Sequence, residues 1–231
     1  MKIRLSKALA KAGISSRRRA EELIFAGLVQ VNGETIRLPQ FIVDPAIDII
    51  EYKNRAIVIQ NTFFYYIMNK PKGYLCTHQS RKGEKLIYDL FPKTHPRLFS
   101  VGRLDKDTTG LLVITSDGKF AQKIAHPSYS CEKEYLVVCR ESITVEYLKK
   151  LKRGCVIEGR LAIPKKVEKI QETKLSITLE EGIKREIRIL VQQCGLTLLS
   201  LRRIRIGKLR LRNLPIGTYR EMTPREKACF F

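Results

Sequence analysis

Residues 101–118 read VGRLDKDTTGLLVITSDG, a polar loop followed by an apolar segment. Residues 111–115 predict a buried strand, because they are uniformly apolar up to a terminal Thr. The loop before that strand holds two carboxylates, Asp105 and Asp107, beside Arg103. Loops that a rigid strand holds in place are where catalytic groups usually lie, so we expect the active site here. The alternative is a charged surface turn.

One enzyme class that fits this loop is the haloacid-dehalogenase type of phosphatase, whose D-x-D-x-T pattern matches Asp105 to Thr109. In such enzymes the first Asp attacks phosphorus and the second acts as acid and base. The pattern requires a strongly apolar strand before the first Asp, and residues 100–104 form a poor one. It also requires a later lysine and an acidic pair for magnesium, which the chain after Asp117 does not offer. We therefore set the phosphatase aside.

The charge of the chain indicates a polyanionic partner. Among 231 residues there are 44 Lys and Arg against 23 Asp and Glu, a formal net charge of +21 at pH 7. Nucleic acid is the commonest partner of so basic a protein. No apolar run approaches the ~20 residues that span a bilayer, and the first residues do not form a signal peptide. We expect a soluble, cytoplasmic monomer that does not act at a membrane.

Metal and cofactor motifs are absent from the sequence. The cysteines and histidines are dispersed, with no CxxC pair and no zinc-type spacing, so reduced thiols and no metal site are expected. No glycine motif for phosphate binding occurs either. We expect no cofactor. These residues are Cys76, Cys131, Cys139, Cys155, Cys194, Cys229, His78, His95 and His126.

Residues 1–58 predict a small α+β domain. One helix is expected over residues 7–12 with Ser6 as its N-cap, and a second over residues 17–26. Asn32-Gly33 follows a short alternating strand and is a strong signal for a β-hairpin. A linker is expected over residues 55–62.

Arg17, Arg18 and Arg19 open the second helix of this domain, where the helix dipole disfavours cations by up to ~1 kcal/mol. A bound phosphate would relieve that repulsion, so we expect RNA contact rather than a merely solvated face. A DNA-binding helix-turn-helix is disfavoured because a hairpin follows at once. The stretch LSKALAKAGISSRRRAEELIFAGLVQVNG resembles the RNA-binding domain shared with ribosomal protein S-four, over residues 2–50. The resemblance implies binding to structured RNA through the second helix.

Residues 62–231 alternate between apolar, strand-like runs and helical stretches. They predict strands over 63–68, 111–115 and 135–139, turns over 69–73 and 116–118, helices over 145–152 and 187–194, and period-two alternation over 198–211. Five motifs here resemble, in order, the RsuA/RluB branch of RNA pseudouridine synthases. They are NKPKGY (69–74), GRLD with TTGLL and TSDG (102–118), HPS with EKEYLV (126–137), EGIKREIR (181–188) and LRRIRIG (201–207).

This resemblance implies a second α+β domain built on a mixed, mostly antiparallel sheet flanked by helices. It implies isomerisation of a uridine in ribosomal RNA to pseudouridine, on naked RNA or on a pre-ribosomal particle, without a cofactor. The C1′–N1 bond breaks, the uracil turns and C5 joins C1′. Whether the target is small- or large-subunit RNA stays open. A non-enzymatic RNA-binding assembly factor is the alternative.

The resemblance also implies three catalytic residues. Asp105 is the carboxylate, and it either attacks C1′ or removes the 2′ proton; both routes remain open. Arg188 is the cation that keeps it ionised, which requires a separation of ~4–6 Å. Tyr135 stacks on the flipped uracil and helps to move the C5 proton, since a base that leaves its stack needs a flat partner.

Further contacts to the substrate are implied for Arg103, for Leu201 on the other side of the base, and for Lys70 and Lys72 of the first motif. Asp107 is expected to brace the loop.

Arg203 and Arg205 form a second basic feature, with Lys208, Arg210 and Arg212 beyond them. Strict alternation would place Arg203 and Arg205 on one strand face. Like charges so placed repel unless phosphate lies against them, so we expect RNA contact. A solvated face is the alternative.

Overall fold

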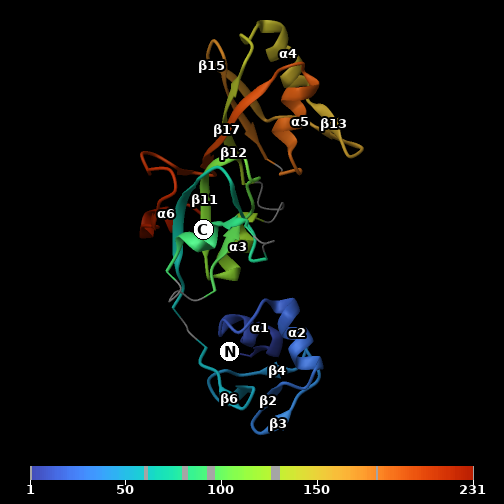
Figure 1. Ribbon diagram of the computed structural model, residues 1–231, viewed down its shortest axis with the longest axis vertical. Helices are drawn as coiled ribbons and strands as arrows, with labels where there is room; N and C mark the ends of the chain where they lie inside the picture. The colour runs from blue at the N-terminus through green and yellow to red at the C-terminus, as the bar shows by residue number, and fades with distance from the viewer. Residues whose placement is uncertain are drawn as a thin grey trace. The chain divides into compact units, whose positions relative to one another are not determined.

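A computed structural model describes residues 2–59, 62–79, 83–92, 97–125, 131–180 and 182–230. They form two compact units: the first contains the described residues up to Phe63 together with residues 97 and 98, and the second contains the rest. Figure 1 shows the helices and strands of both. Within the described ranges, no helix is long and apolar enough to cross a bilayer.

The first unit contains two helices and two small sheets. α1 spans Leu5–Lys11 and α2 spans Arg17–Phe25. The sheets have the orders β1-β4 and β3-β2-β5-β6. Their strands are β1 (Ile3–Arg4), β2 (Val29–Val31), β3 (Glu34–Thr35), β4 (Ile42–Val43), β5 (Ile50–Tyr52) and β6 (Arg55–Ala56).

The hairpin at Asn32-Gly33 is confirmed, whereas the expected cap of the first helix is wrong. Asn32 and Gly33 have φ values of 52° and 86°, the left-handed pair that a two-residue hairpin requires. Ser6 lies inside α1 and is buried, and the N-cap is Arg4. The helix begins early because Leu5 is fully buried and its N–H donates to Phe41 O at 2.7 Å.

The second unit is an α+β domain built on a nine-stranded sheet, as predicted. The strand order is β15-β16-β12-β17-β11-β7-β19, with β10 beside β11 and β18 beside β17. The sheet strands are β7 (Tyr65–Lys70), β10 (Phe99–Val101), β11 (Thr109–Thr115), β12 (Lys133–Cys139), β15 (Lys166–Gln171), β16 (Lys174–Leu179), β17 (Leu198–Ile206), β18 (Leu209–Arg210) and β19 (Tyr219–Glu221).

Helices and two small strand pairs complete this unit. The helices are α3 (Gly118–Ala125), α4 (Val145–Arg153), α5 (Glu186–Gln193) and α6 (Pro224–Ala228), with a 3-10 turn at Ile87–Leu90. The strand pairs are β8 (Tyr74–Leu75) with β9 (Lys85–Leu86), and β13 (Cys155–Ile157) with β14 (Arg160–Ala162). The predicted helices over 145–152 and 187–194 are confirmed as α4 and α5.

Two local predictions in this unit are wrong. The expected turn at residue 69 lies two residues later, because β7 continues through Asn69 and Lys70 while it pairs with β11. The turn expected at residues 116–118 is the start of α3. Asp117 Oδ1 accepts from the backbone N–H groups of Lys119 at 2.9 Å and Phe120 at 3.3 Å, so it caps that helix.

A hydrophobic cluster that we call the α5-side core packs one face of the sheet against α4 and α5. Val137, Ile177 and Leu201 contribute from the strands, and Leu151 and Leu190 from the helices. Tyr135 is partly buried against the same cluster. This core therefore joins the helix that carries Arg188 to the strands β12 and β17.

β11 and β17 meet at the centre of the sheet in a short parallel contact, where Thr109 lies opposite Arg202 and Gly110 opposite Arg203. Gly110 has φ +105°, and a Cβ there would lie 2.2 Å from Arg203 O. Only glycine tolerates both the conformation and the close approach. This contact joins the half of the sheet that contains β12 to the half that contains β7.

Gly110→Ala is expected to lower the free energy of unfolding by about 2–5 kcal/mol, from backbone strain and overpacking. Urea unfolding followed by circular dichroism measures the change. Gly118→Ala is the matched control, because a Cβ at Gly118 meets nothing within 4 Å, and it should leave the transition unchanged or slightly raised. Equal transitions for the two variants would contradict the proposed constraint.

Candidate active site

Lys70 lies beneath the loop that carries Asp105 and holds its backbone. The side chain is fully buried, and Nζ donates to the carbonyls of Asp105 (3.1 Å), Lys106 (3.3 Å), Thr108 (3.0 Å) and Pro71 (3.1 Å). Burial lowers the pKa of Lys70. The prediction that Lys70 contacts the substrate is therefore wrong, because its ammonium group is buried and occupied by the loop.

Two further donors hold the same loop. Gly73 N donates to Lys106 O at 2.8 Å, and Cys76 Sγ lies 3.5 Å from Leu104 O. Burial raises the pKa of Cys76, which keeps it a protonated thiol donor. The loop backbone is thus fixed from β7 and β8, whereas the Asp105 side chain is left available.

Asp105 and Arg188 lie together, although 83 positions separate them in the sequence. Arg188 Nε, from α5, is 3.4 Å from Asp105 Oδ2, and its Nη2 donates to Thr108 Oγ1 at 3.0 Å. The Nε–Oδ2 contact is an ion pair without hydrogen-bond geometry, since buried Nε has no hydrogen-bond acceptor among the described residues. The side chain of Asp105 is 37% exposed and that of Arg188 19%, so the carboxyl group of Asp105 stands at an open edge beside the guanidinium group of Arg188.

Tyr135 belongs to a row of cross-strand partners that crosses the sheet at the base of the Asp105 loop. Cross-strand partners run from Lys70 on β7 to Gly110 on β11, Arg203 on β17 and Tyr135 on β12. Tyr135 packs against the α5-side core, to which α5 also belongs. Leu201 is a buried member of that core.

Known proteins identify the family of the chain. The RNA pseudouridylate synthase family model matches residues 64–193, and the S4 domain matches residues 3–46. The chain belongs to the RNA pseudouridylate synthase family. Members of this family are isomerases, so the chain is an RNA-modifying enzyme, as the sequence predicted.

Several relatives span most of the chain. Ribosomal large subunit pseudouridine synthase B of Bacillus subtilis is 37% identical over 229 residues, 96% of this chain and 93% of that protein. A chloroplastic protein of Arabidopsis thaliana is 42% identical over 242 residues, 96% of this chain, which spans only 59% of that longer protein. A crystal structure of a pseudouridylate synthase superposes with a TM-score of 0.72 at 28% identity, covering 99% of this chain and 100% of that one.

Three residues with predicted roles, two in the Asp105 loop and one in the turn after β7, lie on the surface. Arg103, Lys72 and Asp107 are exposed, and none makes a side-chain hydrogen bond or ion pair with the described residues. Asp107 therefore does not brace the loop by a hydrogen bond; Lys70 does so instead. This role of Lys70 was not predicted, although a lysine that ends an apolar strand directly before a proline is a signal for it.

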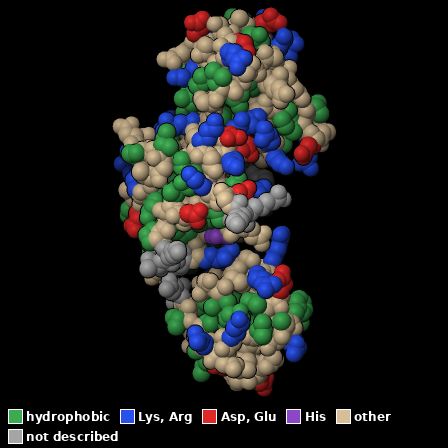
Figure 2. Space-filling view, viewed as in Figure 1, with side chains coloured by type: hydrophobic (Ala, Val, Ile, Leu, Met, Phe, Trp, Pro, Cys, Tyr) green, Lys and Arg blue, Asp and Glu red, His purple; other side chains and the backbone are tan. Residues whose placement is uncertain are grey.

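Arg203 and Arg205 are not free surface arginines, which corrects the prediction that both contact RNA. Arg203 is only 4% exposed, and its Nε donates to Leu111 O at 2.8 Å. Arg205 binds Glu134 of β12 and Glu132, two residues before it in the chain. β17 itself contains no acid, and the two acids that bind Arg205 come from a segment about 70 residues earlier in the chain. Lys208, Arg210 and Arg212 remain exposed, and Lys and Arg side chains gather over the middle of the second unit (Figure 2).

Arg17, Arg18 and Arg19 form the first turn of α2, which contains no acid. All three are exposed, and Arg19 is paired with Glu22. Ser16 Oγ accepts from Arg19 N at 3.2 Å and caps the helix. The predicted motif at residues 126–128 and Glu181 lie outside the described residues.

Lys70→Met is expected to lower the free energy of unfolding by about 2–4 kcal/mol, because it leaves the loop carbonyls without a buried donor. Hydrogen exchange of the amides of residues 104–108 should accelerate at the same time. Lys72→Met is the matched control and should stay within about 0.5 kcal/mol of wild type, as surface changes do. Unchanged amide exchange in Lys70→Met would show that the ammonium group does not hold the loop.

Proposed function

We propose that this chain converts one uridine of ribosomal RNA into pseudouridine, with Asp105 as the catalytic carboxylate. The observation that carries this proposal is the contact of Asp105 with Arg188, made from two distant segments inside the family's domain. A nearby cation favours the ionised carboxylate. An ionised Asp can attack C1′ or remove the 2′ proton, and the fixed loop brings it to the sugar in one geometry.

The reaction balances without an oxidant or a reductant. The C1′–N1 bond breaks, the uracil turns, C1′ bonds to C5, and the C5 proton is lost while N1 gains a proton. Uridine in a folded RNA must leave its stack before a carboxylate reaches C1′. We assign Tyr135 to stacking on the flipped base, worth about 1–3 kcal/mol, with Leu201 on the base's other side. Arg103 and Lys72, both exposed near the loop, would contact the flanking phosphates.

The target we favour is large-subunit ribosomal RNA, because relatives in Bacillus subtilis and Vibrio cholerae are named as large-subunit enzymes. The substrate would be naked RNA or an assembling particle. The chain would act where ribosomes assemble, which in bacteria is the cytoplasm. The first unit would hold structured RNA through the exposed arginines of α2.

Asp105→Asn is expected to abolish release of tritium from RNA labelled at uridine C5, a decrease on the order of a thousandfold or more. Asn keeps the size of the side chain and removes its charge, so RNA binding should persist. Both ribosomal RNAs and their subunit precursors would be supplied, without added cofactor or metal. Binding without release by the wild-type protein on any of them would favour an RNA-binding assembly factor instead.

The double variant Arg17→Ala with Arg18→Ala is expected to weaken RNA binding at low salt. The slope of log Kobs against log[salt] should fall in magnitude by about 0.7–0.9 for each phosphate that the variant no longer neutralises. Lys149→Ala with Arg160→Ala removes the same charge from exposed sites in the second unit and should leave the slope unchanged. Equal slopes for both double variants would rule out a specific phosphate contact at α2.

A further inference from the structure

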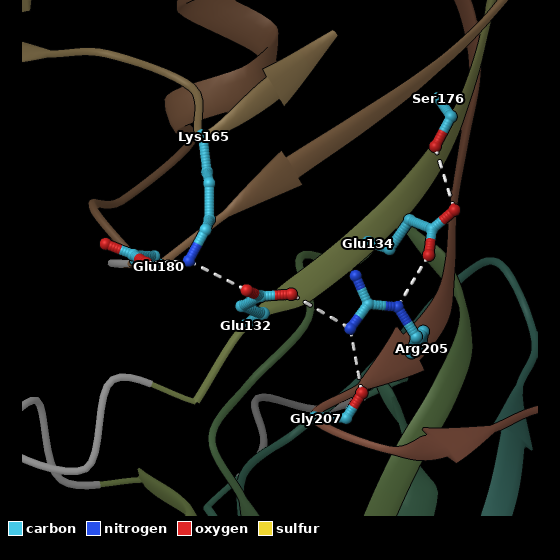
Figure 3. A network of polar contacts seen from close by, with 7 residues as sticks. All are labelled: Glu132, Glu134, Lys165, Ser176, Glu180, Arg205 and Gly207. Carbon is cyan, nitrogen blue, oxygen red and sulfur yellow. Dashed lines mark hydrogen bonds and ion pairs between the residues drawn. The ribbon is translucent and has the colours of Figure 1, made fainter. Parts of the chain in front are cut away.

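Arg205 is enclosed by acceptors on the sheet (Figure 3). Its Nε donates to Glu134 Oε2 at 2.6 Å, and its Nη1 donates to Glu132 Oε2 at 3.1 Å and to Gly207 O at 2.8 Å. The Arg205 side chain is 16% exposed. Charge-assisted bonds of this kind fix both direction and distance. We call Arg205 with Glu132 and Glu134 the Arg205 clamp.

The clamp extends over three neighbouring strands. Ser176 Oγ on β16 donates to Glu134 Oε1 at 2.9 Å, so both oxygens of Glu134 are occupied. Burial opposes ionisation of Glu134, but hydrogen bonds from Arg205 and Ser176 outweigh it and leave the pKa lowered. Hydrogen bonds from Lys165 and Arg205 lower the pKa of Glu132. Both clamp acids are therefore ionised at neutral pH.

The clamp lies directly beside a β-bulge. Glu134 is opposite Arg205, whereas the next residue on β12, Tyr135, is opposite Arg203. Ile204 is therefore an extra residue in β17. Consecutive residues of β12 point to opposite faces, so Arg203 and Arg205 do so too, which is why strict alternation misplaced them.

The bulge decides which way Tyr135 faces. Tyr135 follows Glu134 directly and packs against the α5-side core, on the opposite face from the clamp. A shift of register by one residue would turn it to the other face. The same shift would separate Arg205 from Glu134, so the clamp opposes it. Bulges are common next to active sites because they redirect a side chain.

We propose that Arg205 is a positioning residue, which with Glu132 and Glu134 locks the bulge at Ile204 and so holds the ring of Tyr135 on the side of the Asp105 loop. This inference rests on the role proposed above for Tyr135. Arg205 touches neither substrate nor the reacting atoms; it acts through the backbone of β12.

Lys165 provides a matched control within the same network. It pairs with Glu132 at 2.9 Å and with Glu180, and its side chain is 47% exposed. It does not contact Glu134, which lies at the bulge. Lys165→Gln therefore removes one charge from the network without releasing the clamp.

The first arm of the test reads the ring itself. The chain contains no tryptophan, so Tyr135→Trp places the only tryptophan, which can be excited selectively over the tyrosines, at the position in question. Adding Arg205→Lys should shift its emission to the red and steepen quenching by acrylamide, because the ring leaves its half-buried place. Adding Lys165→Gln should change neither. Identical emission and quenching with and without Arg205→Lys would overturn the proposal.

The second arm measures single-turnover rate and RNA affinity with Tyr135 intact. Arg205→Lys should slow the rate about 10–100-fold, the scale of a small misplacement in an active site, while RNA affinity and its salt slope are retained. A loss of RNA affinity with an unchanged rate would mark Arg205 as an RNA contact, because Lys keeps the charge but not the forked donors of Arg, and it would overturn the proposal.

If Arg205→Lys does not fold, Glu134→Gln can be tested with the same two readouts. Gln keeps the shape of the Glu134 side chain and removes the charge that binds Arg205. It should reproduce the emission shift and the slower rate, and wild-type behaviour in both would count against the clamp. An inactive wild-type protein would refute the proposed function while the fluorescence arm still tests the clamp.

Discussion

The buried ammonium group of Lys70 is the interaction on which the proposed active site depends. A charge in the interior is costly unless its donors are satisfied, and here carbonyls of the Asp105 loop satisfy it. The requirement acts in both directions: the ammonium group needs the loop in place, and the loop carbonyls need the ammonium group. Asp105 consequently contributes its carbonyl to the scaffold and keeps its carboxylate for Arg188.

The position of Lys70 follows from the centre of the sheet. Lys70 pairs with Gly110, and Gly110 pairs with Arg203 in the only parallel contact of the nine-stranded sheet among the described residues. Without a Cβ, Gly110 allows β11 and β17 to approach. The half of the sheet that fixes the Asp105 loop is thereby joined to the half that carries Tyr135 and rests on α5. Asp105 and Arg188 meet beside this junction, and Tyr135 is the next cross-strand partner beyond Arg203.

The sequence could predict what depends on local pattern. The α+β architecture, the hairpin at Asn32-Gly33, helices α4 and α5 and the family itself follow from periodicity, turn residues and ordered motifs. The sequence could not predict features that depend on which strands pair with one another. The burial of Lys70 beneath the loop, the extra residue Ile204 and the acids opposite Arg205 are set by pairing partners far away in the chain, and one extra residue is enough to reverse an inference from alternation.

The basic side chains of the protein fall into two groups, those that the protein's own acceptors bind and those that are exposed to solvent. Lys70 and Arg205 are bound by carbonyls or carboxylates of the protein, and a phosphate could reach them only by displacing those acceptors, which would leave buried groups unpaired. Arg203 is buried, with its Nε on Leu111 O. Arg17 and Arg18 at the start of α2 are exposed and pair with no acid among the described residues, so a phosphate there replaces only water and relieves repulsion from the helix dipole. A count of basic residues therefore overstates the surface available to RNA. Contact with RNA should be sought where cations are exposed and lack acids of their own.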